Sequence, residues 1–172
     1  MHTPNNPPSA TGAHTGELPH YQNPHSNDSV LLSTTPLDTP AAIAFVSHPD
    51  AGGIDIFLGT TRAHTHPTHG QLLALDYDAY PEMALAQIRT MIATARTRWP
   101  ILKCAIHHRT GTVPIGHPSV IIALSTPHRA EAFEACRHLI DTLKTLAPIW
   151  KKDIYQHAAA WHNDPDNGNL KQ

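Results

Sequence analysis

Residues 120–155, VIIALSTPHRAEAFEACRHLIDTLKTLAPIWKKDIY, combine a strand, a long helix and a second strand in close succession. The stretch opens on an uninterrupted apolar run, which is typical of a central strand buried on both faces. Thr126 and Pro127 then predict a helix start, with Thr126 as the N-cap. Pro148 ends this helix, and residues 149–155 have the pattern of a last strand.

The predicted helix has apolar residues at the helical period, so we expect one of its faces to point inward. At the border of this face lies Lys144, where partial burial would lower its pKa. On the strand that follows, Lys151 and Asp153 share one face and Lys152 takes the other. The residues expected to face inward are Phe133, Cys136, Leu139, Ile140, Leu143 and Leu146.

Further elements are predicted outward from this stretch. Residues 38–40, Asp-Thr-Pro, predict the start of a short helix with proline at its first position that runs to about residue 48, and Pro81 opens a long helix whose apolar stripe reaches Trp99. Residues 30–32 form a short apolar run, strands are expected at residues 54–58, 72–77 and 102–108, and a loop at residues 63–70. In the strand at residues 72–77, Leu73, Leu75 and Tyr77 should share one face of the sheet. The strand at residues 102–108 should have one buried face. This order of elements predicts an α+β fold.

Length and composition narrow the class of protein. The 172 residues suffice for one domain, and a net charge of −2 excludes a strongly basic nucleic-acid binder. Two cysteines cannot form a disulfide framework, so we expect a cytoplasmic protein, and neither a signal peptide nor a transmembrane segment is readable. Residues 1–28 are predicted to be a disordered Pro- and His-containing extension, 29–164 the folded domain, and 165–172 a flexible tail.

Two places are suited to holding an anion. His128 and Arg129 lie at the predicted helix start, where free N–H groups and the helix dipole attract negative charge. Arg62 follows a strand that ends at Gly59 and enters a loop, a common location for an anion-binding arginine. Ordinary surface side chains would give the same pattern at either place.

Histidine and cysteine carry two further alternatives. His64, His66 and His69 resemble a metal cluster, but their loop has no cysteine or acidic partner, so no metal and no cofactor is expected. Both cysteines are predicted to be buried, Cys104 on a strand and Cys136 on the long helix, and a buried thiol is a poor nucleophile or sulfur carrier.

Five segments of the chain together resemble the catalytic (large) subunit family of molybdopterin synthase. They are FLGTTR (57–62), LDYDAYPEMA (75–84), HRTG (108–111), HRAEAFEAC (128–136) and PIWKK (148–152). The resemblance spans residues 29–161 and implies an α/β hammerhead with an added antiparallel β subdomain. It also implies sulfur transfer from the C-terminal Gly-Gly thiocarboxylate of a small ubiquitin-like subunit to cyclic pyranopterin monophosphate, forming the dithiolene of molybdopterin. The implied assembly is a homodimer within a heterotetramer.

The resemblance also assigns roles to matching positions. Lys144 and Lys151 would be the catalytic lysines of sulfur transfer. Asp153 stands where glutamate is usual, so its carboxylate has a shorter reach. The substrate-binding positions would be Thr60, Thr61, Arg62, His128, Arg129, Lys152 and Asp153.

Helix geometry adds a constraint on this site. Arg129 and Lys144 are 15 residues apart on one predicted helix, which is roughly 22 Å along its axis. We therefore expect the site to be shared across a homodimer, with His128 and Arg129 of one chain facing Lys144 and Lys151 of the other. The alternative function is a non-catalytic, His-rich metal-binding or scaffold protein on the same fold.

Overall fold

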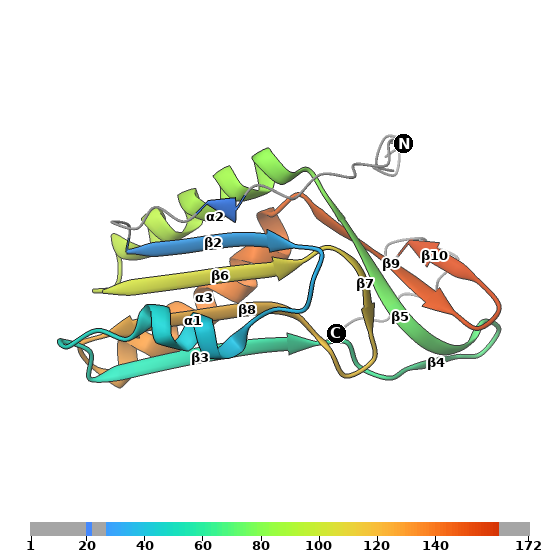
Figure 1. Ribbon diagram of the computed structural model, residues 1–172, viewed down its shortest axis with the longest axis horizontal. Helices are drawn as coiled ribbons and strands as arrows, with labels where there is room; N and C mark the ends of the chain where they lie inside the picture. The colour runs from blue at the N-terminus through green and yellow to red at the C-terminus, as the bar shows by residue number, and fades with distance from the viewer. Residues whose placement is uncertain (1–19, 22–26, 162–172) are drawn as a thin grey trace.

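The computed structural model describes residues 20–21 and 27–161, and its first layer is a mixed sheet of five strands. The strand order is β1-β2-β6-β8-β3, so β8 is interior and β3 is a terminal strand (Figure 1). Strands β2 and β6 are parallel, and the other neighbours are antiparallel. The bounds are β1 His20–Tyr21, β2 Asp28–Ser33, β3 Gly53–Thr60, β6 Lys103–Arg109 and β8 Pro118–Thr126.

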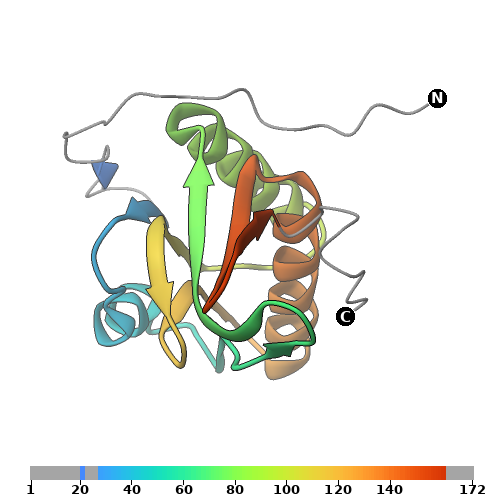
Figure 2. The ribbon, with the colours of Figure 1, turned by 90° about the vertical axis from the view of Figure 1, so that its right-hand side faces the viewer.

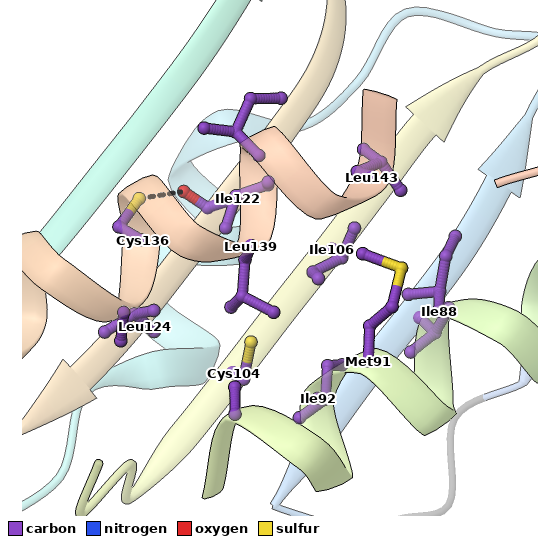
Figure 3. Close-up of a cluster of buried hydrophobic side chains, with 14 of the residues drawn as sticks. Ile88, Met91, Ile92, Cys104, Ile106, Ile122, Leu124, Cys136, Leu139 and Leu143 are labelled. Carbon is purple, nitrogen blue, oxygen red and sulfur yellow. Dashed lines mark hydrogen bonds between the residues drawn. The ribbon is translucent and has the colours of Figure 1, made fainter. Parts of the chain in front are cut away.

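Three helices cover the two faces of this sheet. Helix α1 (Thr39–Val46) packs on one face, while α2 (Pro81–Arg96) and α3 (Arg129–Leu146) pack on the other (Figure 1). The larger core lies between the sheet and the α2–α3 layer, where aliphatic side chains of both helices meet those of β6 and β8 (Figure 3). The helix α3 is thereby fixed along its whole length against the sheet.

A second, antiparallel sheet stands across one end of the first (Figure 2). Its order is β10-β9-β5-β4, and β7 pairs with β5 on the side away from β9. The bounds are β4 Thr65–His66, β5 Gly70–Ala79, β7 Gly111–Pro114, β9 Ile149–Tyr155 and β10 Ala159–Trp161. The α+β prediction with an added antiparallel subdomain is confirmed, and β9 has the predicted bounds.

Several sequence predictions are wrong in detail. Leu73 is half-exposed and does not share a face with Leu75, because the register of β5 against β9 shifts between Leu72 and Ala74 and a bulge turns Leu73 outward. Strand β6 is buried on both faces, since α1 covers the face that was expected to be open. The loop predicted at residues 63–70 includes the short strand β4.

The predicted inward face of α3 is also wrong at its two outermost members. Phe133 is 58% exposed and Leu146 is 52% exposed, whereas Ala132 and Ala135 take buried positions. The small alanines let the helix approach the sheet closely, which leaves the two larger side chains at the margins of the contact. The other four predicted residues, Cys136, Leu139, Ile140 and Leu143, are buried.

Most of the extension predicted at residues 1–28, and the tail at 165–172, lie outside the described residues. Within that extension, His20–Tyr21 pair with Val30 and Leu31 as β1. None of the helices in the described part of the chain has the length and apolar character needed to cross a membrane.

His108 makes the stability of this fold dependent on pH. It is buried on β6, its ring packs edge-on against Tyr77 with centroids 5.0 Å apart, and its Nδ1 lies 2.8 Å from the carbonyl oxygen of Arg109. Burial lowers the pKa of His108 to about 4, against an ordinary value of 6.5. The folded state therefore binds fewer protons than the unfolded state between these two values.

We expect the His108 contribution to be complete above pH 6.5 and to be lost as the pH falls towards 4. Relative to His108→Gln, the wild-type chain should lose on the order of 2 kcal/mol of unfolding free energy between pH 7 and pH 4.5. Urea unfolding of both proteins at the two pH values measures the difference. An equal loss in both would show that His108 does not carry this dependence.

Candidate functional site

Charged side chains gather where the end of α3, the strand β9 and the loop after β3 meet. Lys151 is half-buried on β9, and burial lowers its pKa. The carboxylate of Asp153 opposes this shift, while the positive charges of Lys144 and Arg62 add to it. Three of the predicted cations and one acid therefore share a single electrostatic environment.

Asp153 and Tyr77 are the two neighbours of Lys151 on the strands β9 and β5. Asp153 is only 5% exposed, and the Tyr155 hydroxyl donates to its Oδ2 at 3.4 Å. Tyr77 lies opposite Lys151 in the β5–β9 ladder, and its hydroxyl donates to Ser119 Oγ at 3.2 Å. Burial, and secondarily the Asp153 charge, raise the pKa of Tyr77, whereas the Ser119 contact lowers it. Periodicity alone did not identify Tyr77 as part of this cluster.

The desolvated lysine is Lys151, and the prediction of a partly buried Lys144 is wrong. Lys144 is exposed, because it lies in the last turn of α3 beyond the helix–sheet contact. Its charge is placed favourably there, at the negative end of the helix dipole. A lysine with a lowered pKa has a larger neutral fraction near pH 7, so Lys151 is suited to accept a proton.

His128 and Arg129 lie at the opposite end of α3 (Figure 1). His128 is the N-cap and Arg129 the first helical residue, so the predicted Thr126 N-cap is wrong. Thr126 is instead the last residue of β8, where it pairs with Gly53. Both His128 and Arg129 are exposed, and the His128 side chain makes no capping hydrogen bond. The unbroken helix keeps them roughly 22 Å from the Lys144 end.

The remaining predicted residues take different positions. Thr60 is exposed at the end of β3, whereas Thr61 is 1% exposed and its amide donates to the His117 carbonyl at 3.0 Å. Lys152 faces away from Lys151, as predicted, and its ammonium lies 5.9 Å from the ring centroid of Trp161. Of this group, only Arg62 is shown to act on Lys151, through its charge, whereas Thr61 is buried at the His117 backbone and Lys152 faces Trp161.

The rings of the histidine loop pack against one another and against Tyr155. The His66 and His69 rings stack with centroids 4.3 Å apart, and both also pack near the ring of Tyr155. Among the residues that the structure describes, no group of three His, Cys, Asp or Glu side chains could hold a metal ion.

Both cysteines are buried in the core, as predicted (Figure 3). Burial raises the pKa of Cys104 far above its usual range and that of Cys136 to about 12. Neither thiol supplies a thiolate near neutral pH, so neither is suited to nucleophilic chemistry.

Known proteins resemble this chain over most of its length. The family model described as MoaE protein matches residues 32–146. A molybdopterin synthase catalytic subunit from Taeniopygia guttata is 39% identical over 140 residues, covering 81% of this chain and 89% of the relative. A molybdopterin synthase structure from Staphylococcus aureus superimposes with a TM-score of 0.72 and 28% identity, covering 79% of this chain and 96% of that chain.

A third relative adds information on the fold alone. It is a structure from Helicobacter pylori 26695, described as a complex of subunits 1 and 2 of molybdopterin-converting factor. It superimposes with a TM-score of 0.63 at 21% identity, covering 79% of this chain and 91% of that chain.

The Lys151 environment can be tested by titration. Asp153→Asn removes the charge that favours protonated Lys151, so the pKa of Lys151 should fall further; Lys144→Ala and Arg62→Ala each remove a repelling charge, so it should rise. Carbon-13 NMR of the lysine ε-carbons between pH 7 and 11 measures these changes. Lys103, remote on β6, is the internal reference, and a Lys151 titration unmoved by all three substitutions would refute the cluster.

Proposed function

The chain belongs to the MoaE protein family, and from this premise we propose that it is the catalytic subunit of a molybdopterin synthase, transferring sulfur onto a pterin substrate. The sulfur donor in this proposal is the C-terminal Gly-Gly thiocarboxylate of a small ubiquitin-like subunit, and the acceptor is cyclic pyranopterin monophosphate. Two sulfur atoms, delivered in two rounds, form the dithiolene of molybdopterin. In each round the C–S bond to the carrier breaks and a C–S bond to a substrate carbon forms. Water supplies the oxygen that converts the carrier to a carboxylate, and the oxygen displaced from the substrate carbon leaves as water.

The observation that carries the proposal is a cationic cluster in a chain whose thiols are inert. Because Cys104 and Cys136 are buried with raised pKa values, sulfur must reach the site on another molecule. The cations at Arg62, Lys144 and Lys151 suit an anionic substrate and a thiocarboxylate donor.

The two catalytic lysines would have different tasks. Lys151, with its lowered pKa, would accept or return a proton as the pterin ring opens, and Asp153 and Tyr77 would hold it in place. Lys144, which is exposed in the last turn of α3, would stabilise charge on the attacked thiocarboxylate. Thr60 and Arg62 would contact the substrate at the same end of the molecule, whereas Lys152 and Asp153 would support the site from the strand that carries Lys151.

A second copy of the chain would complete the site. His128 and Arg129 are candidates for the substrate phosphate, yet they lie at the far end of α3 from Lys144. Strand β3 runs along the same distance as α3. Its first residue, Gly53, lies against the backbone of Arg129, and its last residue, Thr60, leads to Arg62. An antiparallel, two-fold arrangement of two β3 strands would therefore bring each His128–Arg129 pair to the partner's lysines.

The surface of β3 fits such a contact. As the terminal strand of its sheet it has one edge outside the described ladder, and its outward face carries Ile54, Ile56 and Leu58, each between 37% and 41% exposed. Ile43 of α1 extends this apolar face, and Phe133 of α3 lies exposed on the other side of the sheet. Exposed apolar residues grouped along an open edge are typical of a protein interface.

Reconstitution tests the activity. The chain, mixed with a thiocarboxylated small subunit and cyclic pyranopterin monophosphate, should yield a dithiolene product. Lys151→Ala and Lys144→Ala should each lower turnover by about 100-fold or more, within the range of losses for acid–base and charge-stabilising groups. Lys103→Ala, which removes an equivalent charge outside the cluster, should keep full turnover. No product despite demonstrated binding of the small subunit would refute the proposed function.

Mixed dimers test the shared site. Chains carrying Arg129→Ala and chains carrying Lys144→Ala should each be nearly inactive alone. After unfolding and refolding together, statistical mixing makes about half of the dimers heterodimers, and each of these has one intact site. We expect recovery of about one quarter of wild-type turnover in the mixture, measured by product formation. Mixing Lys151→Ala with Lys144→Ala, which damages the same half-site, should recover nothing; equal behaviour of the two mixtures would contradict sharing.

A further inference from the structure

We propose that Gly52 and Gly53 are positioning residues that set the location of His128 and Arg129. This inference rests on the proposed function, because it deepens the role of the His128–Arg129 end of the site. The two glycines lie where α1 leads into β3, far in sequence from the residues that they would position.

The chain around Gly52 packs directly on the turn between β8 and α3. The Gly52 amide donates to the Thr126 carbonyl at 3.1 Å, and the Thr126 hydroxyl donates to the His128 carbonyl at 2.7 Å. Thr126 is fully buried between these two contacts. The backbone that carries His128 is therefore held from the β3 side and by the end of β8.

Both glycines are required for space and not for backbone conformation. Neither has a positive φ, because the described glycines with positive φ are Gly70, Gly111 and Gly116. A Cβ on Gly52 would lie 2.2 Å from the Pro127 carbonyl oxygen. A Cβ on Gly53 would lie 3.0 Å from the Arg129 Cα and 3.2 Å from its amide nitrogen. In both cases the obstacle is backbone, which cannot rotate away as a side chain can.

The contacts described above act on the backbone of this turn and not on the side chains of His128 and Arg129. His128 is an N-cap without a side-chain capping bond, and both His128 and Arg129 point to solvent. Their positions thus depend on where the backbone of residues 126–129 lies. A methyl group added at residue 52 must displace either the backbone of residues 126–129 or the backbone of residue 52 itself. A methyl group added at residue 53 requires the Arg129 backbone to shift by only a few tenths of an ångström.

The expected effects follow this order. Gly52→Ala should raise the KM for cyclic pyranopterin monophosphate by about tenfold or more, and Gly53→Ala by about threefold, since small misplacements of binding groups weaken substrate affinity steeply. The turnover number should change little, because Lys144 and Lys151 lie at the other end of each chain. Gly111→Ala is the control: it introduces strain at φ +72° with no atom within 4 Å of its Cβ, so it should lower the melting temperature while leaving KM unchanged.

A double-mutant cycle separates positioning from general destabilisation. In a His128→Ala/Arg129→Ala background, Gly53→Ala should no longer raise KM, because the groups that it displaces are absent. Gly53→Ala also covers the case in which Gly52→Ala does not fold. An unchanged KM in both glycine variants, or a KM increase that persists in the His128→Ala/Arg129→Ala background, would overturn the proposal.

Inorganic phosphate gives a reading that does not depend on turnover. Phosphorus-31 line broadening should show weaker phosphate binding by Gly52→Ala and Gly53→Ala than by the wild-type chain and Gly111→Ala. If the wild-type chain binds phosphate in this way but forms no dithiolene, the proposed function fails and the positioning role stands. If phosphate binds all four proteins equally, the positioning role fails, whatever the activity.

Discussion

The packing of α3 against the first sheet is the contact on which the site depends. Cys136, Leu139, Ile140 and Leu143 bury one face of this helix over the aliphatic side chains of β6 and β8. The helix is therefore straight, fully supported and unable to bring its two ends together. This apolar contact therefore sets the locations of His128 and Arg129 at one end of α3 and of Lys144 at the other. The second sheet adds Lys151 and Asp153 at the Lys144 end.

Electrostatics and burial are combined differently at the two ends. At the C-terminal end of α3, the strand β9 buries Lys151 beside Asp153 and within reach of two other cations, so protonation there is tuned by its surroundings. At the N-terminal end, His128 and Arg129 are exposed and held by backbone packing. The first end has the properties of a place where protons move, and the second those of a place where a charged group is held.

Periodicity in the sequence was sufficient for the three helices and the longer strands, and for the faces of β9 that carry Lys151, Lys152 and Asp153; it missed the short strands β1, β4, β7 and β10. Periodicity failed where packing against another element determines whether a side chain is buried. A bulge opposite β9 turned Leu73 outward, and α1 covered a face of β6 that its own sequence leaves ambiguous. The pairing of Thr126 with Gly53 moved the helix start two residues on, and the burial that lowers the pKa of Lys151 comes from a sheet assembled from distant segments. The resemblance to a known family, more than local pattern, assigned Arg62, His128 and the two lysines Lys144 and Lys151 to one site.

The two buried cysteines also bear on how such a chain withstands oxidants. Peroxides attack the thiolate and need access to it. Cys104 on β6 and Cys136 on α3 are buried in the core between the first sheet and the helices α2 and α3, with pKa values that keep them protonated. A protein that handled sulfur on its own cysteine would need a reductant after each oxidative insult. This chain keeps both cysteine sulfur atoms inside the hydrophobic core, where they serve for packing, so these two thiols are separated from the redox state of the surroundings.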